Sequence, residues 1–136
     1  MGEAAMKRMI LTALVGIVMF SSTSFAEWKK VSENVNGTAY VDFERIKKHD
    51  EYVHFWQLTD YLKPSEQEIL SIKKYIQGDC KKFRYKWLNF WFYKEPMGEG
   101  NAGGRGLRAG NEGWKYPLPD TSIEIALKSV CQRAGM

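Results

Sequence analysis

The chain's only thiols, Cys80 and Cys131, are the residues whose chemistry is most definite. In an oxidising compartment an even number of cysteines forms disulfides, and two cysteines allow only one pairing within a chain. That bond would close a loop of about fifty residues, which stabilises a fold by about 4 kcal/mol in the chain-entropy model. Two free or intermolecular thiols are the alternative. Catalytic thiol chemistry is not expected, because the sequence has no C-x-x-C motif.

A second candidate site is a run in which basic and aromatic residues are interleaved. Between Lys73 and Lys94 the sequence has seven basic residues, a single acid and eight aromatic rings. In a strand over residues 82–93, simple alternation places one set of side chains on each face. The first set is Phe83, Tyr85, Trp87, Trp91 and Tyr93, and the second is Arg84 and Lys86. The candidate binding residues are Lys82, Arg84, Lys86, Trp87 and Trp91, together with Arg105 and Arg108 of the glycine-rich loop that follows.

Several partners suit such a basic and aromatic surface. It is compatible with an anionic polysaccharide, lipid headgroups or an acidic protein surface. Strands of this composition also bind single-stranded nucleic acid, but no nucleic acid is expected as a partner of an exported protein. The plainer interpretation is that the aromatic side chains form a core and the lysines a solvated face.

No arrangement of residues in the sequence indicates an active site, a metal or a cofactor. His49 and His54 are the only histidines, and neither has a cysteine or carboxylate at metal-ligand spacing. Residues 98–103 match G-x-G-x-x-G, but the glycines that follow oppose the helix that a dinucleotide site requires. We therefore expect a non-enzymatic protein with no cofactor.

The elements that would position these residues are strands followed by one helix. Strand patterns cover residues 28–32, 38–43, 52–61, 69–80 and 82–93, with an Asn36-Gly37 hairpin signal and a short helical turn capped by Asp42. Residues 121–124 form a capping box, and Ile123, Ala126 or Leu127, Val130 and Cys131 follow at helical spacing. We expect an α+β fold, in which a mostly antiparallel sheet of five to six strands carries a C-terminal helix on one face, tied by the disulfide.

The first 26 residues have the features of a signal peptide. Lys7 and Arg8 precede an uncharged run over residues 9–20, and Ser24-Phe25-Ala26 places small residues at the −3 and −1 positions before Glu27. This run spans about 18 Å as a helix, short of the ~30 Å hydrocarbon core, so a retained membrane span is the weaker interpretation. We expect residues 1–26 to be removed on export, to the periplasm or beyond the cell. The remaining residues, 27–136, have the length of one domain.

The predicted mature chain resembles the surface-adhesin protein E-like family of Gram-negative bacteria over essentially its whole length. The resemblance is carried by Glu27-Trp28, Tyr40-Val41-Asp42, residues 56–61 (WQLTDY), Asp79-Cys80, Pro96-Met97-Gly98 and Val130-Cys131. It implies an antiparallel sheet with a disulfide-locked C-terminal helix, and a non-enzymatic role.

The same resemblance bears on location and partners. The family's characterised adhesin is an outer-membrane protein that can dimerise and binds host matrix and serum proteins. The present chain lacks that adhesin's lipid-accepting cysteine, and we carry over no ligand-contact residue. The alternative to an adhesin-like role is a periplasmic structural or assembly module with no host ligand.

Overall fold

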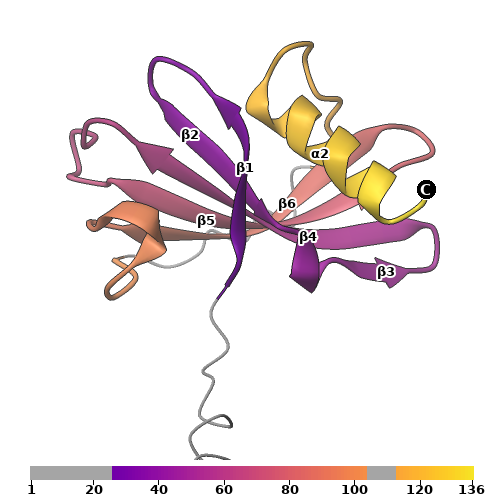
Figure 1. Ribbon diagram of the computed structural model, residues 1–136, viewed down its shortest axis with the longest axis horizontal. Helices are drawn as coiled ribbons and strands as arrows, with labels where there is room; N and C mark the ends of the chain where they lie inside the picture. The colour runs from indigo at the N-terminus through magenta and orange to yellow at the C-terminus, as the bar shows by residue number, and fades with distance from the viewer. Residues whose placement is uncertain (1–25, 104–112) are drawn as a thin grey trace, which may run out of the picture.

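The computed structural model describes residues 26–103 and 113–136 and confirms the predicted α+β fold (Figure 1). Its strands are β1 (Trp28–Glu33), β2 (Gly37–Asp42), β3 (Lys47–His49), β4 (Tyr52–Tyr61), β5 (Ser71–Asp79) and β6 (Arg84–Tyr93). They form one antiparallel sheet in the order β1-β2-β4-β5-β6, with the short β3 pairing to β4. The predicted signal peptide lies outside the described residues, except for Ala26.

One short helical turn lies between β2 and β3, and a second short turn and one longer helix follow the last strand. Two 3-10 turns are η1 (Phe43–Arg45) and η2 (Pro96–Gly98), and the C-terminal helix is α2 (Ser122–Arg133). Asp42 caps η1 as predicted, accepting a hydrogen bond from the amide of Glu44. Sequence reasoning missed β3, which has three exposed residues and no apolar pattern that would mark it.

The first hairpin depends on a side-chain turn and on a close approach between strands. The Asn34 side-chain oxygen accepts hydrogen bonds from the amides of Asn36 and Gly37. Gly37 then begins β2 beside β4, where a Cβ atom would overlap the backbone carbonyl of Asp60. Glycine is thus required at this position because the backbones meet, and not because the turn needs a positive φ.

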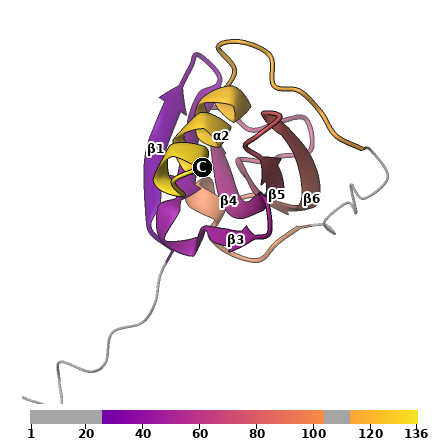
Figure 2. The same cartoon turned by 90° about the vertical axis from the view of Figure 1, so that its right-hand side faces the viewer.

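Helix α2 packs on one side of the sheet, over β1, β2 and β4 (Figures 1 and 2). The Thr121 hydroxyl accepts a hydrogen bond from the amide of Glu124, as the capping box predicts. The Glu124 carboxylate accepts in turn from the amide of Asp120, one residue earlier than expected. The helix therefore begins at the predicted residue, with a slightly different pair of capping bonds.

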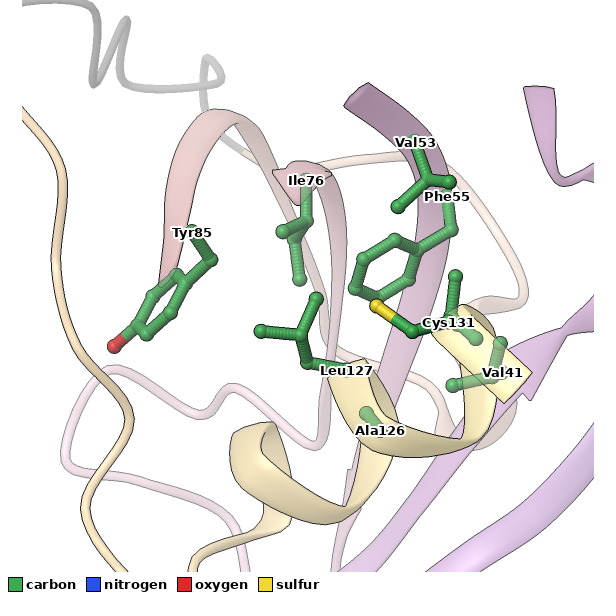
Figure 3. Close-up of a cluster of buried hydrophobic side chains, with 9 residues drawn as sticks. Val41, Val53, Phe55, Ile76, Tyr85, Ala126, Leu127 and Cys131 are labelled. Atoms are coloured by element: carbon green, nitrogen blue, oxygen red, sulfur yellow. The ribbon is translucent and has the colours of Figure 1, made fainter. Parts of the chain in front are cut away.

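The core lies between this helix and the sheet (Figure 3). Its fully buried side chains come from the apolar stripe of α2 and from three neighbouring strands: Val41, Val53, Phe55, Ile76, Ala126, Leu127 and Val130. Gly78 of β5 lets the helix approach closely, because a Cβ there would lie 2.6 Å from a methyl carbon of Leu127. The helix and the sheet are thus in contact at a position where no side chain intervenes.

The predicted disulfide is confirmed. Cys80, directly after β5, is bonded to Cys131 in the last turns of α2, with 5.7 Å between their Cα atoms. The bond joins the end of the sheet to the far end of the helix, so that α2 cannot leave the core without opening a covalent link. The predicted alternative of two free thiols is wrong.

A bulge in β6 corrects the predicted faces of that strand. Ile76 pairs with Trp87 and Tyr75 with Asn89, so that Leu88 is an extra residue in β6. An inserted residue reverses the alternation beyond it. Trp91 and Tyr93 therefore lie on the same side as Arg84 and Lys86, and the prediction that they share a face with Trp87 is wrong.

Candidate functional site

The side of the sheet opposite α2, called here the open face, carries the residues best placed to bind a ligand. Cross-strand partners share a face, so the register assigns this side to Tyr52, His54, Trp56 and Leu58 of β4, Lys73, Tyr75 and Gln77 of β5, and Arg84, Lys86, Trp91 and Tyr93 of β6. In the described part of the chain, η2 contacts one end of this face and Trp114 the other. Between them, residues of β1, η1 and β3 line hollows beside Trp56.

Four rings form a continuous row across the centre of the open face. Starting from β4, His54 stacks on Tyr75 with 5.9 Å between ring centroids. Tyr75 lies 4.8 Å from Trp56, and Trp56 lies 5.1 Å from Trp91, both pairs in tilted geometry. We call these four residues the aromatic row. All four are half-buried, so their rings support one another and keep part of their surface in contact with water.

Positive charge surrounds the aromatic row. Arg45, from η1, has 49% of its side chain exposed and is paired through Nε with the buried carboxylate of Asp42 at 3.3 Å. Lys73 lies beside the row, with its Nζ 5.0 Å from the centroid of Tyr93. Burial, and secondarily the charge of Arg45, lowers the pKa of Lys73. The two cations are thus close enough to repel one another.

His54, at the other end of the row, also lies near positively charged side chains. Burial first, and then the neighbouring His49 and Lys47, lowers its pKa below the usual value. Lys47 is the cross-strand partner of His54 in β3 and is exposed. Cations therefore stand at both ends of the aromatic row.

Two adjacent hollows lie along this row. One, of about 150 Å³, is lined by Ala26, Trp28, Arg45, Trp56, Lys73, Trp91 and Tyr93. The other, of about 510 Å³, is lined by residues 44–47, Trp56 and Tyr75. They share Trp56 and Arg45, so together they form an elongated surface with rings along it and cations at its sides. The one acid among the lining residues, Glu44, is ion-paired with Arg133 at 3.5 Å.

Trp114 closes the far end of the open face over two of the predicted binding residues. Its ring lies 5.3 Å from that of Tyr52, and the cations of Arg84 and Lys86 stand 4.3 Å and 4.5 Å from its centroid. Arg84 also donates a hydrogen bond from Nε to the buried Asp79 carboxylate at 2.9 Å. Arg84 and Lys86 are therefore committed to contacts within the fold.

Asp79 organises the turn between β5 and β6. One carboxylate oxygen accepts from the amides of Lys81 and Lys82, and the other from Arg84. Burial alone would raise the pKa of Asp79. The hydrogen bonds from Lys82 and Arg84, with the charge of Arg84, outweigh burial and lower it. The contacts of Asp79 therefore stabilise the folded state more when its carboxylate is ionised.

We expect an acid-dependent loss of stability from this group. Because the pKa of Asp79 is lower in the folded than in the unfolded state, its contribution is complete above about pH 4 and is lost as pH falls further. At pH 7 the Asp79→Asn variant should be less stable by about 1–2 kcal/mol, since Arg84 keeps partial contact with water. Urea unfolding from pH 7 to pH 2 measures this. The difference from wild type should shrink below pH 4, and a constant difference would contradict the assignment.

The predicted binding residues do not form one site. Trp91 belongs to the aromatic row, whereas Trp87 is on the α2 side, 5.4 Å from Phe90 and beneath the ammonium group of Lys115. Lys82 is exposed in the β5–β6 turn, where its amide donates to Asp79, and Arg105 and Arg108 lie outside the described residues. The part of Lys82, Arg105 and Arg108 in binding stays a prediction.

Sequence reasoning missed Trp56, Tyr75, Arg45 and Lys73 as a group. A signal for part of it was present, because Tyr52, His54 and Trp56 alternate with the core residues of β4. The contribution of Arg45 was not visible, because η1 comes to lie beside β4 only when β2 and β3, which flank it in sequence, both pair with that strand. In the described residues no three histidine, cysteine or acidic side chains gather as metal ligands.

The decisive comparison is with protein families. The model of the surface-adhesin protein E family matches residues 28–132, nearly the whole predicted mature chain. The chain belongs to the surface-adhesin protein E family. This membership supports an adhesin-like role and implies an exported protein. In the described residues no helix has the length and apolar character to cross a membrane.

Solved structures agree with this family fold. Protein E of Haemophilus influenzae, in its crystal form II, is 22% identical, with 84% of this chain and 94% of that chain covered and a TM-score of 0.60. Protein E from non-typeable Haemophilus influenzae is 21% identical, with 85% and 81% covered and a TM-score of 0.56. At this identity the likeness establishes the fold alone. No curated protein sequence matches the chain.

Proposed function

We propose that this member of the surface-adhesin protein E family is a non-enzymatic binding protein of the cell envelope, and that the open face is its contact surface. The observation that carries the proposal is the asymmetry of the sheet. Helix α2 covers one side with an apolar core, whereas the centre of the other side presents half-buried rings and cations. Because ordering large rings at a solvated surface does little for stability, such a surface is typical of an interaction site.

The family indicates the class of partner. Host matrix or serum proteins are the expected partners of an adhesin-like protein, and Trp56, Trp91, Arg45 and Lys73 are the residues we assign to the contact. Aromatic and arginine side chains commonly provide most of the binding energy at protein surfaces. Because the family's characterised adhesin can dimerise, a homodimer is a further expectation for this chain.

One observation favours the alternative, a periplasmic module with no host ligand. Both cysteines are joined in the disulfide, so neither is left to carry a lipid. Location therefore decides between the two functions, since an adhesin must be reachable from outside the cell.

Protease treatment of intact cells tests the location directly. If the protein is an adhesin, it should be cleaved on intact cells to the same extent as after rupture of the outer membrane. If instead the protein is secreted and found in the medium, an adhesin-like role predicts that it binds to immobilised matrix or serum proteins. Cleavage only after rupture, with none in the medium, would support the periplasmic alternative.

Binding to those immobilised proteins tests the surface. We expect Trp56→Ala to weaken binding by about tenfold or more, and Trp87→Ala, on the α2 side, to leave it nearly unchanged. Equal losses in both variants would contradict the assignment of the open face. Thermal unfolding of each variant establishes that it is folded.

A further inference from the structure

The charge and shape of the open face indicate the chemistry of its ligand, if the proposed function is accepted. Three cations, Arg45, Lys47 and Lys73, stand around Trp56 in the two hollows. Of these only Arg45 has an ion pair within the described residues, and its side chain is half-exposed. The surface thus has a surplus of positive charge that a ligand would have to balance.

Besides negative charge, the arrangement of the rings sets a second requirement on the ligand. Trp56, Tyr75 and Trp91 touch in tilted geometry, with interplanar angles of 42° and 39°. They form a curved, stepped apolar surface, on which a puckered ring lies better than an extended planar one. The C–H groups on the faces of a sugar ring carry slight positive charge and pack against the negative face of an aromatic ring.

Length is the third requirement. The hollows adjoin at Trp56 and Arg45, and the row of rings continues from Trp91 across to His54. A single small ion would use only a fraction of this surface. A chain of linked sugars, with an acidic group on some of them, would contact rings and cations in turn.

We propose that the open face binds an acidic polysaccharide, with sugar rings packed on Trp56 and Trp91 and carboxylate or sulfate groups paired with Arg45, Lys47 and Lys73. Such a chain can follow the two hollows and reach the half-buried rings, which lie between cations from three elements. Mutual repulsion between Arg45 and Lys73 is relieved when an anion lies between them.

Four polymers and a single-stranded oligonucleotide test the chemistry of the ligand, using tryptophan fluorescence and calorimetry on the purified protein. Heparin supplies sulfated sugars, polygalacturonate carboxylated sugars, dextran neutral sugars, and poly-glutamate charge without sugars. We expect binding to heparin or polygalacturonate to be at least tenfold tighter than to dextran and poly-glutamate. Poly-glutamate binding as tight as that of the polysaccharides would overturn the proposal, as would tighter binding to a single-stranded oligonucleotide.

Matched variants test whether the polysaccharide binds at the open face. Lys47→Gln should weaken binding several-fold and flatten its dependence on salt, whereas Lys48→Gln, its neighbour on the α2 side of β3, should not. Trp91→Ala should cost about tenfold or more, and Trp87→Ala little. Lys47 is exposed, so its replacement should leave the fold intact even if Trp91→Ala does not. Equal effects of Lys47→Gln and Lys48→Gln would overturn the placement.

The proposal and the proposed function fail in different ways. Suppose that the open-face variants lose binding to matrix proteins, while the wild-type protein binds none of the polysaccharides. That result would refute the ligand chemistry alone. A protein that is inaccessible on intact cells but binds polysaccharide through Trp91 would refute the adhesin role alone.

Discussion

Replacing Cys80 and Cys131 together with alanine should lower the free energy of unfolding by about 4 kcal/mol. The bond spans 51 residues, and opening it restores the freedom of that whole loop to the unfolded chain. For a domain of this size, the loss corresponds to a fall in melting temperature on the order of 15 °C or more. Thermal and urea unfolding of the variant and wild type measure both quantities.

Reductant provides the control for this experiment. Wild-type protein in excess dithiothreitol should unfold close to the double variant, and the variant should not respond to reductant. Because Cys131 is itself buried, a variant much less stable than the reduced wild type would show that lost packing dominates. A loss below about 1 kcal/mol in both would contradict a clamping role for the bond.

The Leu127→Ala variant should be destabilised by about 2–5 kcal/mol. Leu127 is fully buried where α2 meets the sheet, and its replacement leaves a cavity that the disulfide-held helix cannot easily close (Figure 3). Urea unfolding at pH 7 measures the loss. Lys128→Ala, at the neighbouring exposed position, is the control and should change stability by less than about 0.5 kcal/mol.

A substitution at Gly78 tests the contact between Leu127 and the sheet directly. Alanine at this position would crowd both Leu127 and Val53, so Gly78→Ala alone should cost about 1–3 kcal/mol. In the Leu127→Ala background the same methyl group enters the vacated space, and its cost should fall or become a gain. Strictly additive effects would show that the two residues are not in contact as described.

The fold was largely predictable because its strongest signals are local. The period-2 pattern of β4, the capping residue Thr121 and the apolar stripe through Leu127 each specify an element with little help from the rest of the chain. The disulfide was predictable because two cysteines allow one pairing. Beyond these, β3 was missed because it has no apolar pattern and exists only as a partner of β4.

The candidate site was much less predictable, because its residues come from separate elements. Arg45, Trp56 and Lys73 become neighbours only through the order of strands, which a single sequence does not reveal. Conversely, the sequence predicted Arg84 and Lys86 as basic residues available to a ligand. In the structure both cations stand over the ring of Trp114, some thirty residues later in the chain.

The single extra residue at Leu88 has a consequence for how relatives of this chain should be compared. A relative with one residue fewer at this point could keep every tryptophan and phenylalanine and yet turn its Trp91 equivalent inward. Composition and overall similarity would hardly register the difference, although the proposed contact surface would be lost. Inheritance of ligand preference within the family should therefore be judged by whether this insertion is shared.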